Sequence, residues 1–346
     1  MNARYVDVEI TYNGVNITAD IKPFLKSLSY TDAMSGQADD LQIVLEDIEG
    51  VWQSGWFPEM GAALIASITA RNWNEELSPT VLLGSFEIDE ITSSGYPSEV
   101  CIKAVSVPFE NTLRGEEHTR SWEEAELKTI ANDISSSAGM ELFYDTEDNP
   151  VISHAEQSEQ SDLSFLLSLC NEYGLALKVS NGKIVIFDEC KYEEGEAVIT
   201  LVKPGYLLQK DAGIFINSIT RYSFSCKLRD VYAACHVKYQ KSDTKEVIEA
   251  TFKAPEKNGK TLQVREQVDN LSDAERLAKK RLRERNKDEV VGTIGLVGNV
   301  LLMAGTCVNI VGFGVYDGKY IITEANHEVG GAYTTEITVR RCLNGY

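Results

Sequence analysis

The chain has 346 residues, of which 43% are hydrophobic and 25% charged, and its formal net charge is −20. This balance is typical of a folded protein of two or three domains and argues against a disordered chain. A surface this acidic repels nucleic-acid phosphates and anionic membranes. The charge therefore argues against a protein that binds DNA tightly, but not against one through which DNA passes without binding.

Cysteine usage and hydropathy narrow the class of protein further. Seven cysteines are spread along the chain without a C-x-x-C pair, and Cys101, Cys170 and Cys307 lie in apolar stretches, where a free cysteine behaves as a small hydrophobe. We expect neither a disulfide framework nor a metal site, and no cofactor. The N-terminus lacks a signal-peptide pattern, and the most apolar window, residues 300–315, falls short of a membrane span, so we expect no membrane anchor.

Residues 1–115 predict a mainly β domain, either a small barrel or a sandwich. Val6, Val8 and Ile10 alternate with polar residues, and Asn13-Gly14 follows, which is the pattern of a strand and a tight hairpin turn. Further strands are expected at residues 15–21, 41–46, 63–70, 81–91 and 99–105.

Residues 116–190 predict a compact α/β unit. Ser121-Trp-Glu-Glu124 has the capping-box form, which predicts that a helix begins there and runs through Ile134. Ser161 or Asp162 is expected to cap a second helix that ends at Gly174. A hairpin is expected around Asn181-Gly182.

The pattern returns to strands after this unit. Residues 191–225 either connect two β domains or complete the first barrel, and residues 226–346 predict a second β domain with a helix from Ser272 to about Lys287. The helix carries a basic cluster, for which a solvated face is the simplest interpretation. Nucleic-acid binding and a salt contact with an acidic neighbouring subunit are the alternatives. The cluster consists of Lys279, Lys280, Arg281, Arg283, Arg285 and Lys287.

A weak internal repeat relates the two β domains. The segment Gly84-Ser-Phe-Glu-Ile-Asp-Glu-Ile aligns with Gly318-Lys-Tyr-Ile-Ile-Thr-Glu-Ala, and the strands on either side also correspond. The alternative is that all strand–turn–strand text looks alike. If the repeat is real, three chains would present six similar domains in a ring, which would match a six-fold partner to a three-fold assembly.

No pattern of catalytic residues or metal ligands emerges. His118, His154, His236 and His327 lie far apart in the sequence and form no H-E-x-x-H motif, so we expect surface or hydrogen-bonded core positions for them. Nucleophile-elbow, phosphate-loop and calcium-loop patterns are also missing. Among 53 acidic residues, chance carboxylate pairs are expected, and a glycosidase pair is not favoured. These adjacent pairs are 39–40, 46–47, 123–124 and 193–194. We predict no catalytic residue and no enzyme.

Aromatic residues cluster beside a turn at Trp52, Trp56, Phe57 and Pro58. Such side chains either anchor an interface or close one end of a barrel. The second interpretation is slightly favoured.

Three segments resemble the phage late control protein D family, the baseplate hub proteins of contractile tails. The first, "SGQADDLQIVLEDIEGVW", places Ala38-Asp39-Asp40-Leu41, Leu45 and Asp47 near the positions of that family's acidic strand motif. The others are residues 161–188 and 228–239, in the family's order. The peptidase or lysozyme segment that some hub proteins carry is not recognisable here, so the resemblance does not extend to cell-wall hydrolysis.

The resemblance implies a mainly β chain with an inserted α/β unit and two tube-like β-barrel domains. The expected divisions are 1–115, 116–190, 191–225 and 226–346. The family forms homotrimers, in which six barrels make a pseudo-hexameric ring that joins the hexameric tail tube, or a tube-initiator protein, to the trimeric central spike. The α/β unit would face the spike or other baseplate proteins.

The same resemblance places the chain in the baseplate of a virion or phage-tail-like particle that is assembled in the bacterial cytoplasm. DNA would at most pass through the lumen of the ring, and carboxylates of the acidic strand could line that lumen. A cell-wall-binding or cell-wall-degrading tail protein is the alternative function. A spike-type effector carrier is a third, but it would normally need a C-terminal extension beyond Tyr346.

Overall fold

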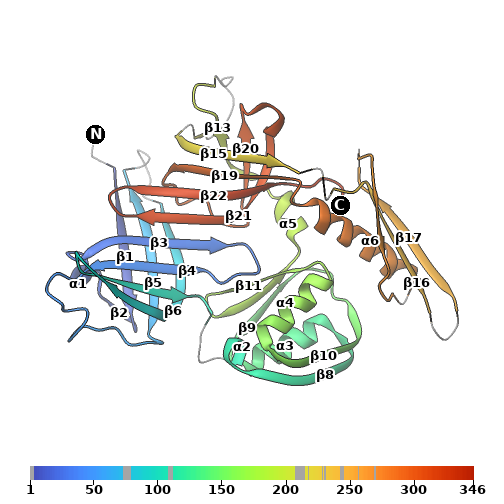
Figure 1. Cartoon of the computed structure of the whole chain (residues 1–346), viewed down its shortest axis with the longest axis horizontal. Helices are drawn as coiled ribbons and strands as arrows, with labels where there is room; N and C mark the ends of the chain where they lie inside the picture. The colour runs from blue at the N-terminus through green and yellow to red at the C-terminus, as the bar shows by residue number, and fades with distance from the viewer. Residues whose placement is uncertain are drawn as a thin grey trace.

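The computed structural model describes residues 4–72, 79–107, 112–206, 215–216, 218–227, 229, 231–241, 245–255, 257–268 and 270–346. The protein is mainly β (Figure 1). Among the described residues, fourteen strands form one large sheet, and the others form three small sheets of two, three and three strands. Two β units share the large sheet, and an α/β unit lies between them in the sequence.

The first β unit is built from seven strands in the order β3-β4-β7-β6-β5-β1-β2. Alternation along the strands sets the core: Leu41, Ile43 and Leu45 point inward, as expected. The hairpin predicted after the first strand is confirmed, because Asn13 and Gly14 take φ values of 45° and 80° in the tight turn between β1 and β2. The elements are β1 (Tyr5–Tyr12), β2 (Val15–Asn16), α1 (Thr18–Ile21), β3 (Leu25–Ala33), β4 (Asp40–Glu46), β5 (Ala63–Arg71), β6 (Thr80–Ser94) and β7 (Glu99–Val105).

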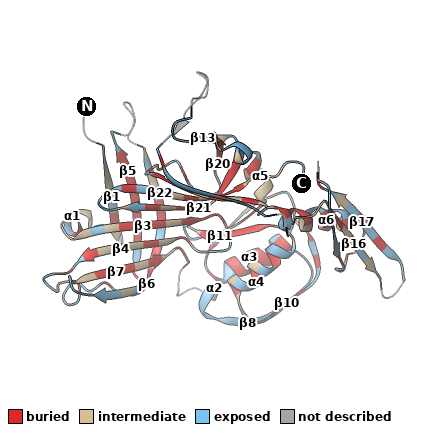
Figure 2. Ribbon diagram, turned by 45° about the horizontal axis from the view of Figure 1, so that its top comes forward, coloured by how far each residue is buried: buried red, intermediate tan, exposed pale blue. Residues whose placement is uncertain are grey.

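The α/β unit packs two helices between a curved two-stranded antiparallel sheet, formed by β8 and β10, and a three-stranded sheet of order β11-β12-β9. Figure 2 shows β8 and β10 as mostly exposed, whereas α3 and α4 bury one face. The elements are α2 (Thr112–Gly115), β8 (Glu117–Glu126), α3 (Leu127–Ser137), β9 (Glu141–Asp145), β10 (Val151–Ser161), α4 (Asp162–Glu172), β11 (Ala176–Ser180), β12 (Lys183–Phe187) and α5 (Glu189–Glu194).

The two helix starts predicted in this unit have different outcomes. Ser161 caps α4 by accepting a hydrogen bond from the Ser164 backbone N–H, so this prediction is confirmed. The capping box at Ser121 is wrong, because that segment lies in β8 and helix α3 begins at Leu127. Pairing with β10 and stacking of the Trp122 ring on Phe165 outweigh the local capping signal.

The second β unit is built from two segments of the chain, residues 197–226 and residues 290–341. The expectation that residues 191–225 could complete the first barrel does not match the observed pairing, since β13 pairs with β20 and β15 with β19. Apolar Ile199, Leu201 and Ile219 explain this choice, because they pack into the core of the second unit. The elements are β13 (Ala197–Val202), β14 (Phe215–Ile216), β15 (Ile219–Cys226), β19 (Val290–Val297), β20 (Cys307–Val311), η1 (Gly314–Tyr316), β21 (Gly318–Val329) and β22 (Tyr333–Arg341).

Between β15 and β19 the chain forms a separate lobe, at the right of Figure 1, with its own sheet and helix. Ala274, Ala278 and Leu282 of the helix are fully buried against this sheet. The helix begins one residue before the predicted Ser272 and is capped by Asn270, whose side chain accepts from the Asp273 N–H. The elements are β16 (Ala234–Gln240), β17 (Val247–Lys253), β18 (Thr261–Val264) and α6 (Leu271–Asn286).

The two β units repeat one strand order. In the first unit the neighbours run β5-β6-β7-β4-β3, and in the second β20-β21-β22-β19-β15, with every one of these pairs antiparallel. In each unit the five strands also occur in the same order along the chain. One architecture is therefore used twice, with the additional lobe inserted in the second copy.

Details of hydrogen bonding align the two copies residue by residue. The Gly61 N–H donates to Ile88 O and the Ile88 N–H to Ala62 O, while Gly305 and Ile322 repeat the same exchange with Thr306. The pairing register with the next strand shifts directly after Ile88 and directly after Ile322. The sequence repeat predicted from Gly84 and Gly318 is therefore confirmed, because both segments lie at the same place in their unit.

Candidate functional site at the joint of the three units

The two β units are joined by pairing of β3 with the second half of β21. The register runs from Leu28 opposite Val329 to Ala33 opposite Glu324. In Figure 1, β15, β19, β22, β21, β3 and β4 follow one another from top to bottom as one continuous sheet. Tyr30 and His327 face each other across the joint, and their rings stack with centroids 6.3 Å apart. The joint is therefore packed like a core.

His327 is a fully buried histidine whose ring nitrogens all have partners. Its Nε2 lies 3.0 Å from Leu302 O, which can only accept, so this nitrogen carries the proton. Its Nδ1 lies 2.9 Å from the Tyr333 hydroxyl, which therefore donates to it. Burial lowers the pKa of His327, because a charged ring would lose its hydration. The expectation of a hydrogen-bonded core position is confirmed for this histidine.

His327→Leu should show how the neutral ring supports the joint. The folded state holds His327 with a lowered pKa, so its contribution is present above the unfolded pKa of about 6.5 and is lost as the pH falls through the folded value. At about pH 7.5 we expect the variant to unfold about 1–3 kcal/mol more easily, because Leu302 O loses its side-chain donor and the Tyr333 hydroxyl loses His327 as an acceptor. The difference in free energy of unfolding between wild type and variant, measured by urea unfolding, should become smaller towards pH 5. A difference that widens on acidification would contradict the neutral tautomer.

A buried ion cluster ties the α/β unit to both β units. Lys178 on β11 lies 2.5 Å from Asp32 Oδ1 on β3 and 3.0 Å from Asp39 Oδ1, and it also donates to Ala33 O at 2.8 Å. The other oxygen of Asp32 accepts from the Ala304 N–H of the second β unit at 2.8 Å. One ammonium group and two carboxylates thus meet where all three units come together.

Charge balance in this cluster is uneven, because one cation serves two acids. Burial raises the pKa of Asp39 to about 6, against the opposing attraction of Lys178. Burial would lower the pKa of Lys178, but Asp32 and Asp39 raise it overall. The acidic strand motif therefore supplies structural carboxylates: Asp39 is buried here, and Asp47 is buried where it accepts the Trp52 N–H. Neither residue is available to a lumen.

A second buried network connects α5, α6 and β22. Glu193, whose side chain is 2% exposed, contacts both Arg283 and Arg340. It also accepts the Leu343 N–H at 2.9 Å. Burial would raise the pKa of Glu193, but Arg340 and Arg283 lower it overall. The network fixes the inserted lobe to the second β unit.

The basic cluster of α6 is therefore not a simple solvated face. Lys280 contacts Asp148, Arg281 binds Glu266, Arg283 binds Glu193 and Lys287 binds Glu284. Lys279 and Arg285 are exposed. Four of the six cations thus have acidic partners within the chain: Asp148 in the α/β unit, Glu193 on α5, Glu266 in the lobe and Glu284 on α6 itself.

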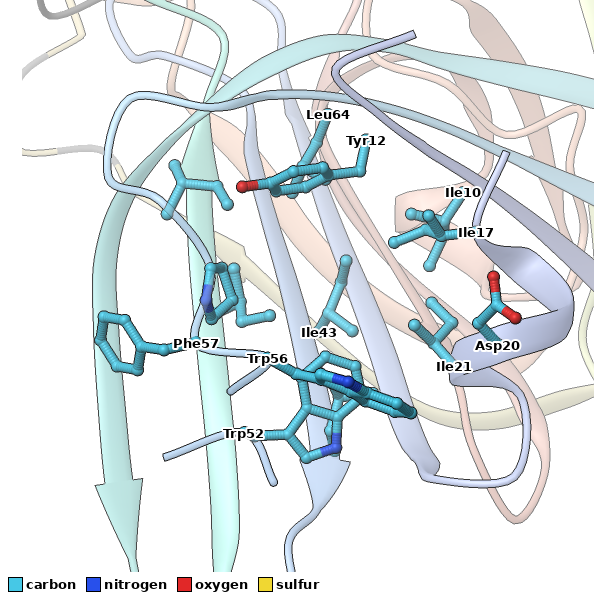
Figure 3. Close-up of a pocket in the computed structure, with 14 residues that line it drawn as sticks. Ile10, Tyr12, Ile17, Asp20, Ile21, Ile43, Trp52, Trp56, Phe57 and Leu64 are labelled. Carbon is cyan, nitrogen blue, oxygen red and sulfur yellow. The ribbon is translucent and has the colours of Figure 1, made fainter. Parts of the chain in front are cut away.

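An apolar cavity of about 350 Å³ opens at one end of the first β unit (Figure 3). Trp52, 6% exposed, packs edge-on against Phe24 and Trp56 in the core. Trp56 and Phe57 lie at the rim and are about half exposed, and Figure 3 shows Phe57 pointing away from the cavity. The predicted closure of the barrel end is confirmed for Trp52, whereas the other two leave an apolar rim.

Truncation of the two tryptophans should separate these roles. Trp52→Ala should lower the free energy of unfolding by about 3–5 kcal/mol, since it removes a buried ring and leaves a cavity. Trp56→Ala, the matched control at a half-exposed ring, should cost less than about 1.5 kcal/mol. Urea unfolding of both variants tests this. Equal losses would mean that the rim is as much a part of the core as Trp52.

The remaining histidines do not form a common site. His118 lies 3.2 Å from Asp162, His154 lies 2.8 Å from Glu123, and His236 lies 2.8 Å from the Thr251 hydroxyl. Within the described ranges, no group of three or more His, Cys, Asp or Glu side chains could hold a metal ion. In the same part of the chain, no helix is long and apolar enough to span a membrane.

Lys178 and Arg340 were not singled out from the sequence. Lys178 follows Ala176 and Leu177 in an apolar run, and Arg340 follows Val339 at the end of a core strand. A lone cation inside an apolar strand is a signal for a buried ion pair, but its acidic partner cannot be named without the fold.

No protein-family model matches the chain. Two curated proteins do. The chain is 31% identical over 180 residues to the "Probable baseplate hub protein" of Escherichia phage P2, and 28% identical over 196 residues to the protein of the same name from Escherichia phage 186. These stretches cover 52% and 56% of this chain but 44% and 47% of the phage proteins, so the match spans about half the length of the curated relatives.

A solved structure shares the fold almost from end to end. The tail protein from Neisseria meningitidis MC58 aligns with a TM-score of 0.69 over 97% of this chain and 96% of its own, at 13% sequence identity. Identity this low establishes the fold alone. The resemblance to hub proteins is confirmed by the two phage relatives: over about half its length, the chain is similar to two proteins named probable baseplate hub protein, and it shares the fold of the Neisseria tail protein.

Proposed function

We propose that this protein is the structural hub of a contractile-tail baseplate, in which three copies form a ring of six similar β units. The ring joins a six-fold tail tube, or a tube-initiator protein, to a three-fold spike. The repeated strand order within one chain carries this proposal, because a trimer of doubled units presents six related surfaces to one partner and three identical chains to the other. The names of the phage relatives support it.

The joint between the β units supports a rigid building block rather than a flexible tandem. Strand pairing, the Tyr30–His327 stack and the Lys178 cluster all bind the units to one another. Such a joint would hold the two units of each copy in a fixed relation within the ring. We keep the predicted division of the chain with one change, which is that residues 191–225 contribute to the second β unit. The predicted divisions are 1–115, 116–190, 191–225 and 226–346.

The proposed role is structural and not enzymatic. The buried charged groups described above pair with one another, which is the arrangement of a scaffold. DNA would at most pass through the lumen of the ring. The net charge of −20 would repel the phosphates and so prevent DNA from binding there. The α/β unit and the inserted lobe would contact the spike or other baseplate proteins, in a virion or tail-like particle that is assembled in the bacterial cytoplasm.

Light scattering on the purified chain, alone and with its tube and spike proteins, tests the proposal. We expect a particle of about three times the 38.4 kDa chain mass, either alone or on addition of a partner. A monomer under every condition would overturn the ring. Incubation with peptidoglycan serves as the second arm, and release of soluble fragments would instead favour a cell-wall-degrading tail protein.

A further inference from the structure

Two strand edges are open in the single chain. Strand β15 pairs with β19 along one edge, and no described residue hydrogen-bonds to the backbone of its other edge. Strand β6 pairs with β7 throughout its second half, but β5 covers its opposite edge only as far as Ile88. Residues 89–94 therefore also present an edge that no described strand covers. Open edges of this kind are templates for pairing with another chain.

These two edges correspond to the two sides of the joint between the β units. In the repeated strand order, β15 takes the place of β3, and β6 takes the place of β21. Strand β21 pairs with β20 in its first half and with β3 in its second half. The segment of β6 that lacks a neighbour is thus equivalent to the segment of β21 that binds β3.

The repeat sets the register of the missing pairing. Ile88 corresponds to Ile322, so Ile91 corresponds to Ala325 and Ser93 to His327. The pairing of β3 with β4 shifts register directly after its first pair, at Leu25, and the pairing of β15 with β19 does so after its first pair, at Ile219. Aligning these two shifts makes Phe224 the counterpart of Tyr30 and Cys226 the counterpart of Asp32.

We propose that β15 of one copy pairs antiparallel with residues 90–95 in a second copy of this chain, that is, with the end of β6 and the residue that follows it. The register places Tyr222 opposite Gly95, Phe224 opposite Ser93 and Cys226 opposite Ile91. This inference rests on the proposed function, since repeating the contact around the ring joins the three copies. The internal joint then occurs three times within chains and the β15·β6 seam three times between chains.

Burial favours this occupant. At the internal joint, Leu28 is fully buried, whereas its counterpart Tyr222 is 49% exposed in the single chain. Ile91 and Phe224 are only partly buried, although both point toward their cores. A second copy would cover this apolar row, as β21 covers that of β3.

Charge favours the same register. Lys227, which directly follows β15, would lie opposite Glu90, whose side chain is half exposed and also pairs with Lys103 of its own chain at 2.7 Å. In a chain of net charge −20, an exposed lysine opposite an exposed glutamate makes this pairing of copies more favourable than one that places acids together.

A cross-link tests the register directly. Cys226 is a free, exposed thiol, so Ile91→Cys should form a disulfide between copies under mild oxidation, giving ladders of covalent dimers and trimers on non-reducing gels. Mass spectrometry should identify the peptide joining residues 91 and 226. Ser94→Cys is the matched control, because its side chain lies on the opposite face of β6. The Ile91→Cys, Cys226→Ser double variant is the second control, and neither should give the ladder.

The same samples, with tube and spike proteins present, are measured by light scattering. A trimer in which Ile91→Cys gives no cross-link to Cys226 would overturn the seam while leaving the hub intact. A monomer under every condition would overturn both. Charge exchange gives an independent arm: Lys227→Glu should weaken the trimer several-fold, and adding Glu90→Lys should restore part of it. Glu90→Lys alone is the control, because it also breaks the Glu90–Lys103 pair within the chain. A double variant whose trimer is no more stable than that of either single variant would contradict the register.

Discussion

Replacing Glu193 by Gln should lower the free energy of unfolding by about 3–5 kcal/mol, the largest loss we expect from a single charge. Glu193 is the acid that both Arg283 and Arg340 contact, and its side chain is 2% exposed. Arg340 keeps a contact with Glu189 at 2.8 Å, but Arg283 loses the carboxylate that its guanidinium contacts. A buried guanidinium without an acidic partner lowers the free energy of unfolding by more than the intact ion pair raises it.

Urea unfolding combined with amide hydrogen exchange measures this loss and locates it. Exchange should accelerate in α5, α6 and β22, while the first β unit serves as the internal reference. Glu194→Gln is the matched control at the next residue, which is exposed, and it should change stability by less than about 0.5 kcal/mol. If both variants lose the same stability, the network does not hold the lobe to the β unit.

Replacing Lys178 by Met should destabilise the joint by about 3 kcal/mol near pH 8, and by less near pH 5. Without the ammonium group, Asp32 and Asp39 are left as two buried negative charges. The folded pKa of Asp39, about 6, lies above the ordinary value, so its protonated form is favoured by folding. That contribution is present at low pH and is lost as the pH rises through about 6 when Lys178 is present. Removing Lys178, which lowers the pKa of Asp39, moves this loss to higher pH and leaves the variant weakest in alkali.

The control for this prediction lies on the neighbouring strand. Lys183→Met removes an exposed pair with Glu141 and should cost less than about 0.5 kcal/mol at either pH. Adding Asp39→Asn to Lys178→Met should recover part of the loss at pH 8. A loss that is independent of pH would show that Lys178 acts by packing alone.

Local patterns predicted most of the secondary structure because their causes are local. Asn13-Gly14 and Asn181-Gly182 adopt positive φ and turn the chain within two residues, and Ser161 caps the helix that directly follows it. The capping box at Ser121 is an equally good local signal, but no helix begins there. Trp122 and its neighbours pair instead with β10, about thirty residues further along the chain. A local rule holds only where no distant partner competes with it.

The sequence by itself determined the turns and the apolar faces of the strands, because periodicity and turn chemistry act within a few residues. A weak repeat and the family resemblance indicated the doubled architecture, and the shared strand order established it. The sequence did not determine that residues 191–225 join the second β unit, that α6 and its sheet form a separate lobe, or that Asp39 shares Lys178 with Asp32. Only the tertiary structure decided these features. Each depends on groups that lie far apart in the chain, and which partner a buried charge or an open strand edge finds is settled by the packing of the whole molecule.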